Sequence, residues 1–161
     1  MLARIIVFFI FTGIFASVYG ISTTSEPTEE EVQEIMSFFE EIIDTIDGIG
    51  IFVHNVTIAL PMFLPGFGVA WGLFSAYSTG FAYSAIAVAN EQVAQLNPLA
   101  VLLTPFGLME LAAYSIGMSR SALLAKNILQ KKWFLIKSQK LIISTEIGIV
   151  VALLLIGGIV E

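Results

Sequence analysis

The feature that most constrains this chain is a long stretch without charge. Residues 48 to 90 include no Asp, Glu, Lys or Arg. A single helix of this length would extend about 65 Å at about 1.5 Å per residue, which is roughly twice the thickness of a bilayer's hydrocarbon core. Pro61 and the pair Pro65-Gly66 lie where such a helix would have to break. The stretch therefore predicts two membrane spans, at 49–64 and 66–90, joined by a tight turn.

Charge is scarce in the rest of the chain as well. Charged residues make up 12% of the sequence, whereas soluble globular domains have about 25%. Most acids lie between 26 and 47, and most cations lie between 120 and 140. Because a charge at mid-depth in a bilayer is costly, we predict an integral membrane protein with both charged windows outside the bilayer. Glu146, near the start of a late apolar run, is expected to snorkel to the interface.

The charge pattern divides the chain into successive segments. We predict a signal anchor or first transmembrane span at 1–21, an extracytoplasmic acidic amphipathic helix at 22–48, a three-span core at 49–119, a cytoplasmic basic segment at 120–140 and a last span at 141–161. The orientation follows from the accumulation of Lys and Arg in cytoplasmic loops. The expected fold is all-α, a polytopic transmembrane helical bundle of about five spans with one external acidic helix.

The first apolar run, from Ile5 to Ile21, has two interpretations. Arg4 precedes it, and the small residues Ala16 and Gly20 lie near its end. This composition is compatible with a cleaved signal peptide and with an uncleaved anchor. We favour the anchor, because the small residues do not form a clean A-x-A cleavage site.

Residues 22–48 have the pattern of an amphipathic helix. Thr28 and Glu31 have the spacing of a capping box, and acids fill the first turn, where they favour the positive end of the helix dipole. Apolar residues follow at the spacing of one helical face, namely Val32, Ile35, Met36, Phe39, Ile42, Ile43 and Ile46. Helices that bind lipid alone are rich in Lys and Arg, which this segment lacks. We therefore expect its apolar face to rest on the chain's own spans or on a partner.

Small residues recur every four positions in the predicted core. We call two series of them the small-residue ribbons: Gly68, Gly72, Ala76, Gly80 and Ser84, and then Ala113, Gly117, Ser121 and Ala125. Small residues at this spacing let helix backbones approach closely in lipid. We interpret the ribbons first as packing faces within the chain. A face that binds another subunit is the alternative.

Glu110 is the only acid near the middle of a predicted span. An ionisable residue in that place is a candidate functional site, and Asn55 and His54 are its candidate partners from the second span. These residues would form an intramembrane polar network, either as a structural hydrogen bond between helices or as a proton or ion relay. Pro105 and Gly107 predict a helix break in the same span, where neighbouring helices or water must satisfy the freed backbone groups.

The composition also excludes several classes of function. The chain has no cysteine and a single histidine, His54, which excludes thiolate zinc sites, iron–sulfur clusters, disulfides and multi-histidine metal centres within this chain. No Ser lies in a nucleophile elbow, and no carboxylate pair adjoins a recognisable cleft. We therefore predict that the chain is not an enzyme by itself and has no catalytic residue, metal site or cofactor. Positive-inside topology accounts for segment 120–140, so no nucleic-acid partner is expected.

A set of motifs in the predicted core carries a family resemblance. The motifs are Phe52-Val53-His54-Asn55, Thr79-Gly80 and Leu103-Thr104-Pro105-Phe106-Gly107-Leu108-Met109-Glu110. Their most specific element is the pattern Pro-x-Gly-x-x-Glu. Over roughly residues 50–125 the chain resembles the stage II sporulation protein M family. Members of that family usually carry His after the Pro and Asn before the mid-span Gly, where this chain has Phe106 and Thr79.

The resemblance implies a role as well as a fold. In endospore-forming bacteria, family membership implies a membrane scaffold that helps localise a cell-wall-degrading complex during engulfment. Relatives also occur in archaea and in bacteria that do not sporulate, so sporulation itself is not carried over to this chain.

We predict a non-catalytic integral membrane scaffold or assembly subunit in the cell membrane. It would bind other integral membrane proteins, or a second copy of itself, through the small-residue ribbons and the external acidic helix, and it would contact the lipid bilayer. One alternative is an accessory subunit of a larger membrane enzyme whose cofactors lie on other chains. Another is a small oligomeric transporter or channel that uses Glu110.

Overall fold

The computed structural model describes residues 2–43 and 47–160, and every regular element in these two ranges is a helix. The longest helices are α1 (Leu2–Ser22), α4 (Phe67–Ala89), α7 (Pro105–Leu129) and α9 (Lys140–Val160). The shorter helices are α2 (Glu29–Ile43), α3 (Gly48–Ala59), η1 (Leu60–Phe63), α5 (Glu91–Ala94), α6 (Pro98–Leu102) and α8 (Trp133–Ser138). The predicted all-α class is therefore confirmed.

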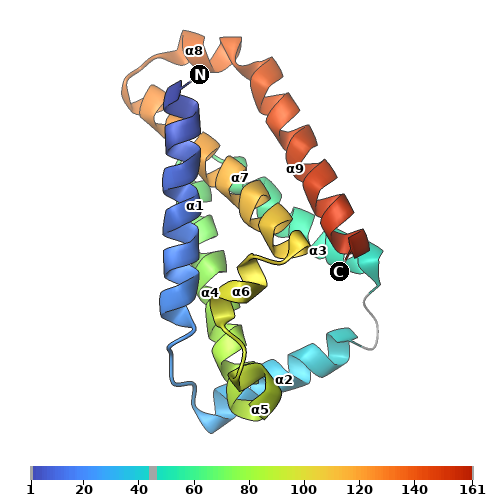
Figure 1. The fold of residues 1–161 in the computed structure, drawn as a ribbon. Coiled ribbons are helices and arrows are strands. Elements are labelled where there is room, and N and C mark those ends of the chain that lie inside the picture. The colour runs from blue at the N-terminus through green and yellow to red at the C-terminus, as the bar shows by residue number, and fades with distance from the viewer. Residues whose placement is uncertain (1, 44–46, 161) are drawn as a thin grey trace.

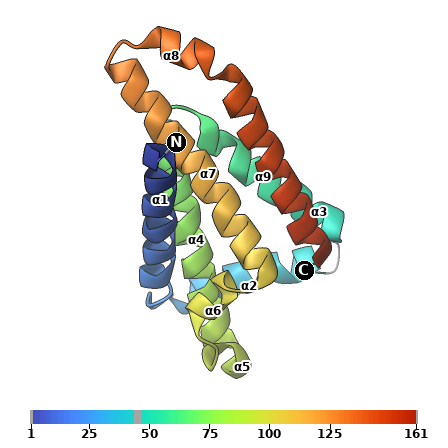
Figure 2. The same ribbon diagram turned by 45° about the horizontal axis from the view of Figure 1, so that its top comes forward.

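The chain runs back and forth between two ends of the molecule (Figure 1). α1, α4 and α9 run from the end that holds α8 toward the end that holds α2 and α5, whereas α3 and α7 run in the opposite direction. The acidic helix α2 lies across one end and α8 lies across the other, as the second view also shows (Figure 2). The acidic and basic windows of the sequence are thus at opposite ends of the fold.

Two of the described helices, α1 and α9, are long and apolar enough to cross a membrane. The apolar segment Gly48–Phe63, formed by α3 and η1, is shorter. α4 and α7 have 23 and 25 residues, which is long enough for a span, but their polar and small residues lower their mean hydropathy. The five-span count therefore stays a prediction, whereas the two apolar helices agree with a membrane protein.

The turn between η1 and α4 depends on one glycine. η1 ends at Phe63 and α4 begins at Phe67, with Gly66 as its N-cap at a φ of 78°. This left-handed conformation is readily adopted by glycine, which has no Cβ to clash with the backbone. The chain therefore reverses direction between α3 and α4 within a few residues.

The predicted capping box opens α2. The Thr28 backbone N–H donates to Oε2 of Glu31 at 2.8 Å, and the Glu31 N–H donates to Oγ1 of Thr28 at 3.3 Å. Along the predicted apolar face, Val32, Ile35, Met36 and Phe39 are half-buried. Ile46 lies outside the described residues, as do the side chains of Ile42 and Ile43. α2 packs against α4, so the chain's own helix covers part of this face.

The core lies where α1, α4, α7 and α9 meet α3 and η1. Its buried members are mostly large apolar side chains, including Phe15, Tyr19, Met62, Tyr114, Met118, Val150 and Leu154. α1 joins this core through Phe15 and Tyr19, which are 3% and 1% exposed, whereas most of its other side chains are exposed or half-buried. The assignment of residues 1–21 as an anchor stays a prediction.

The small-residue ribbons are buried inside the chain. A Cβ at Gly80 would overlap the carbonyl oxygen of Tyr19 on α1, and one at Gly72 would overlap the side chain of Met118 on α7. Gly117 faces Met62, whose Cβ would lie 2.8 Å from an added Cβ. The same holds for the other predicted packing positions, since Gly68, Ala76, Ser84 and Ala113 are also buried. These residues therefore pack against the chain's own helices, as the first interpretation expects, and the binding of other membrane proteins through them stays a prediction.

Candidate functional site

Three charged side chains from three helices meet near the end that holds α8. Arg120 on α7 makes two bonds to Glu146 on α9, from Nε to Oε2 at 2.5 Å and from Nη2 to Oε1 at 2.6 Å. Arg4 on α1 donates from Nε to the same Oε1 at 2.9 Å. We call Arg4, Arg120 and Glu146 the arginine–glutamate cluster. It links α1, α7 and α9 through a single carboxylate.

Neighbouring polar groups accept further guanidinium hydrogen bonds. Arg120 donates from Nη1 to Oε1 of Gln139 at 2.9 Å, and Arg4 donates from Nη1 to Oγ of Ser119 at 2.5 Å. The side chains of Arg120 and Glu146 are 5% and 14% exposed. Two cations share one anion, so the cluster has a net positive charge. Paired charges are tolerated at such a depth, whereas removal of one partner leaves a costly unpaired charge.

Arg120 and Glu146 lie in contact inside the bundle. Arg120 is the first residue of the predicted basic segment 120–140, and α7 continues past it to Leu129 and buries it; the cytoplasmic location of that segment stays a prediction. Glu146, which was expected to snorkel to the interface, instead bonds to the two arginines. The signal that could have revealed the cluster is that Arg4 and Glu146 each stand in an apolar run, where opposite charges tend to pair.

A second polar cluster joins α3 to α7. The amide Nδ2 of Asn55 donates to Oε1 of Glu110 at 2.5 Å, and the hydroxyl of Tyr114 donates to Oδ1 of Asn55 at 3.2 Å. Asn55 is 8% exposed, and Glu110 is half-buried. We call Asn55, Glu110 and Tyr114 the amide–carboxyl cluster. Two of the three residues of the predicted polar network therefore lie in contact, and Tyr114 is a further member for which the sequence carries no signal.

His54 lies apart from this cluster. Successive residues of an α-helix point about 100° apart, so the neighbour of buried Asn55 faces another direction, and His54 is exposed. The hydrogen bond that we describe for Glu110 comes from Asn55 and not from His54. A relay that needs an imidazole beside the carboxylate is not supported by this geometry.

The predicted break lies between α6 and α7. α6 ends at Leu102, Thr104 is the N-cap of α7, and Pro105 occupies its first turn. Oγ1 of Thr104 accepts from the Gly107 N–H at 3.1 Å, which satisfies one freed backbone donor. A Cβ at Gly107 would overlap the carbonyl oxygen of Val101. Gly107 thus allows the end of α6 to pack against the start of α7, one turn before Glu110.

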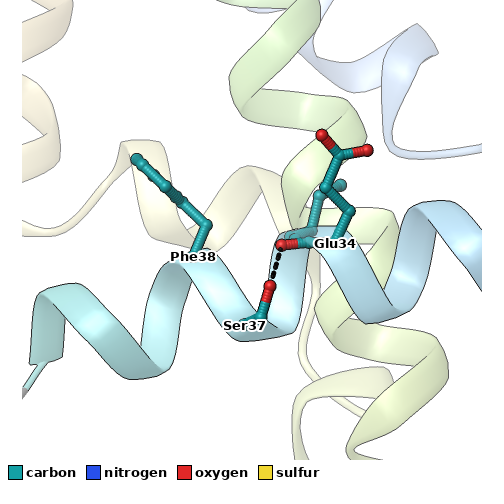
Figure 3. A pocket seen from close by; sticks show the side chains of 4 residues that line it. Glu34, Ser37 and Phe38 are labelled. Atoms are coloured by element: carbon teal, nitrogen blue, oxygen red, sulfur yellow. Dashed lines mark hydrogen bonds between the residues drawn. The ribbon is translucent and has the colours of Figure 1, made fainter.

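Two hollows on the described surface are open and not enclosed. One is lined by Glu34, Ile35, Ser37 and Phe38, all on α2, and the Ser37 hydroxyl donates to the Glu34 carbonyl oxygen at 2.9 Å (Figure 3). A hollow formed by one helix cannot enclose a substrate. The other lies between α1 and α6, with a lining of small and apolar residues that includes Ala16, Gly20, Pro98 and Leu99. Within residues 2–43 and 47–160, no three His, Cys, Asp or Glu side chains are grouped to hold a metal ion.

Both clusters therefore suit a structural task. Each spans two or more helices, and the bonds that we describe use side-chain donors and acceptors to join those helices. In a bilayer, interhelical hydrogen bonds and close packing hold helices together, because lipid supplies little hydrophobic drive for their association. The clusters fix the relative positions of α1, α3, α7 and α9.

Comparison with known proteins identifies the family but not a function. No curated protein matches the chain significantly, and no solved structure does so either. The model of the family described as stage II sporulation protein M matches residues 5–161. This match is wider than the motifs of the core and includes both α1 and α9. The chain therefore belongs to the stage II sporulation protein M family.

Proposed function

We propose that the chain is a non-catalytic membrane scaffold or assembly subunit that organises partner membrane proteins. The observation that carries this proposal is the contrast between the side chains inside the fold and those on its surface. Charged and amide groups inside the fold join its own helices, whereas apolar faces of α1 and α9 and the acids of α2 remain exposed. Such a molecule presents rigid surfaces to other proteins.

The acidic helix α2 is the surface best suited to a protein partner. Its exposed acids are Glu29, Glu30, Glu31, Glu34 and Glu40, and the described part of α2 includes no Lys or Arg to balance them. α2 lies across one end of the molecule (Figure 1), and these exposed acids are accessible to a partner at that end. A partner with basic side chains would complement them.

The apolar faces of α1 and α9 are the second surface. Large exposed side chains follow both helices, including Leu2, Ile6, Phe9 and Ile10 of α1 and Ile142, Ile149, Ile156 and Ile159 of α9. In a membrane these faces contact lipid tails or the helices of a partner. Gly13 on α1 and Gly148 on α9 have nothing within 4 Å of an added Cβ, so a partner helix could approach either face closely.

The test is to extract the tagged full chain from its native membrane into lipid nanodiscs and to measure the mass of the particles. We expect an assembly of fixed stoichiometry. Charge reversal on α2, in the variant Glu29→Lys/Glu30→Lys/Glu34→Lys, should release the partner while the helix content stays unchanged. The matched control is Glu91→Lys, because Glu91 is exposed on α5 at the same end of the molecule.

Other results would overturn the proposal. A particle that contains one copy of this chain and lipid alone would contradict a scaffold role. An assembly that tolerates the α2 reversal would remove α2 from the interface. Ion or proton flux in proteoliposomes that is abolished by Glu110→Gln would favour the transporter alternative instead.

A further inference from the structure

The end of the molecule formed by α8 and the turns on either side of it is strongly basic. It exposes Lys126, Lys131, Lys132 and Lys140. We call these residues, together with α8, the lysine end. No Asp or Glu occurs in the sequence between Glu110 and Glu146, and Glu146 is bonded to Arg4 and Arg120. The acids of α2 lie at the opposite end (Figure 1), so they cannot neutralise these lysines.

Large apolar side chains are exposed among the same lysines. Leu129, Trp133, Phe134 and Leu141 are 84%, 56%, 69% and 79% exposed. Trp is enriched where a membrane meets water, because its ring is apolar and its N–H is polar. Apolar side chains among lysines are the pattern of a segment that lies in the interface of a bilayer and contacts anionic lipids.

The turn before α8 has the geometry to present these side chains outward. Lys131 adopts a φ of 56°, the Lys131 N–H donates to the Ile128 carbonyl oxygen at 2.9 Å, and the Lys132 N–H donates to the Asn127 carbonyl oxygen at 2.9 Å. These bonds form a Schellman motif, whose left-handed position is usually glycine. A lysine there accepts a backbone conformation that is uncommon for residues with a Cβ. The turn sends α8 across the end of the bundle (Figure 2).

We propose that the lysine end binds anionic phospholipid headgroups, with Trp133 and Phe134 in the zone between headgroups and acyl chains. Lysine ammonium groups and lipid phosphates are complementary in charge. The exposed apolar side chains beside the lysines are stabilised when an apolar environment removes them from water. A leaflet of anionic lipid supplies both. The proposal depends on the chain lying in a membrane and not on its role as a scaffold.

A protein partner fits this end less well. An acidic helix such as α2 of a second copy lies at the other end of that copy (Figure 1), so two copies in the same orientation cannot bring α2 to α8. A soluble acidic peptide would neutralise the lysines but would leave Trp133 and Phe134 exposed. Lipid is therefore the occupant that the charges and the apolar side chains favour together.

The first experiment measures lipid selectivity of the intact wild-type chain. Native mass spectrometry in an equimolar mixture of phosphatidylglycerol and phosphatidylcholine should show preferential retention of phosphatidylglycerol. Because each lysine near an anionic surface contributes about a fivefold change in affinity, Lys131→Gln/Lys132→Gln should weaken this retention by roughly twenty-five-fold at low salt. The matched control Glu29→Gln/Glu30→Gln changes two charges at the other end and should leave the selectivity unchanged.

The second experiment places the lipid beside α8. The chain has two tryptophans, so Trp71→Phe leaves Trp133 as a single fluorescent probe in nanodiscs. Brominated phosphatidylglycerol should quench Trp133 more strongly than phosphatidylcholine with the same brominated chains, and added salt should reduce the difference. If Trp71→Phe does not fold, the lipid retention measured with the wild-type chain in the first experiment still decides the proposal.

Three results would overturn the proposal. One is equal retention of both lipids by the wild-type chain. Another is a phosphatidylglycerol preference that survives loss of Lys131 and Lys132, which would place the lipid elsewhere. The third is the absence of Trp133 quenching by either brominated lipid. This result would show that α8 lies away from the bilayer and would favour an acidic protein as the occupant.

Discussion

Arg120 on α7 and Glu146 on α9 face each other through two parallel hydrogen bonds of 2.5 and 2.6 Å. This two-point contact uses the planar guanidinium fork, which lysine does not have. Arg4 bonds to the same carboxylate from α1. One acid therefore holds three helices in register, and its removal should affect the whole bundle.

We expect Glu146→Leu to lower the free energy of unfolding by about 3–5 kcal/mol, because it leaves Arg120 buried without a counterion. Unfolding in mixed micelles, followed by circular dichroism, measures this change. The double variant Glu146→Leu/Arg120→Met should recover part of the loss, since apolar residues of similar size replace both charges. A double variant that is less stable than Glu146→Leu would contradict this account of the cluster.

Glu110 should behave as a structural acceptor. Glu110→Gln keeps an oxygen that can accept from the Asn55 amide, so we expect a change of less than about 1 kcal/mol in the free energy of unfolding. Glu110→Leu removes the acceptor from a buried donor and should cost about 1–3 kcal/mol. The same unfolding measurement compares them. If the two variants are equally unstable, the negative charge of Glu110 matters more than its hydrogen bond.

The close approach of α1 and α4 makes a further prediction. In Gly80→Ala the new methyl group would overlap the Tyr19 carbonyl oxygen, and the backbones would have to separate at a cost of about 1–3 kcal/mol. The control is Gly13→Ala, where the added Cβ has nothing within 4 Å and the helix gains about 0.5–1 kcal/mol from the better helix former. Thermal unfolding in detergent should separate the two variants clearly; equal melting temperatures would argue against the contact.

The start of α2 should depend on pH. Hydrogen bonds from the backbone N–H and the hydroxyl of Thr28 lower the pKa of Glu31 from its ordinary value of 4.5. The folded pKa is depressed, so the stabilisation is complete above pH 4.5 and is lost as the pH falls through the lowered pKa. Amide protection factors of residues 29–32 should therefore fall in acid. Glu31→Gln should abolish that dependence and Glu34→Gln should keep it; a flat wild-type profile would exclude the capping box in solution.

From the packing of α1 we expect that this helix is not cleaved from the chain. Tyr19 donates from its hydroxyl to the Pro98 carbonyl oxygen at 3.1 Å, and Ser22 donates to the Tyr77 carbonyl oxygen at 2.6 Å. Loss of this helix would also leave Glu146 without Arg4. We expect the intact mass of the protein purified from its native membrane to include α1. A mature N-terminus near residue 21 would contradict this prediction.

Local sequence signals predicted the elements that depend on neighbours in the chain. The capping box of Thr28 and Glu31 forms as expected, because both partners lie within one turn. The small-residue spacing around Gly72 and Gly80 correctly indicated close helix packing, but spacing alone does not show which helix approaches. The structure assigns Met118 of α7 and Tyr19 of α1 to those places.

Contacts between distant segments were harder to predict. Asn55, in the second predicted span, was predicted as a partner of Glu110, whereas no pattern in the sequence points to Tyr114 as a member of the same cluster. Arg120 was missed because it adjoins a run of lysines in the sequence and looks like their first member. The sequence has no clear stop signal before Leu129, so it does not show where α7 ends. Because α7 continues to Leu129, Arg120 lies inside the bundle.

The bond between Arg4 and Glu146 joins residues 142 positions apart. Because Glu146 is translated 142 residues after Arg4, α1 holds an arginine without this counterion until the start of α9 has been made. Since unpaired charges in the membrane are unfavourable, we expect a chain that is cut short before Glu146 to be unstable and open to degradation.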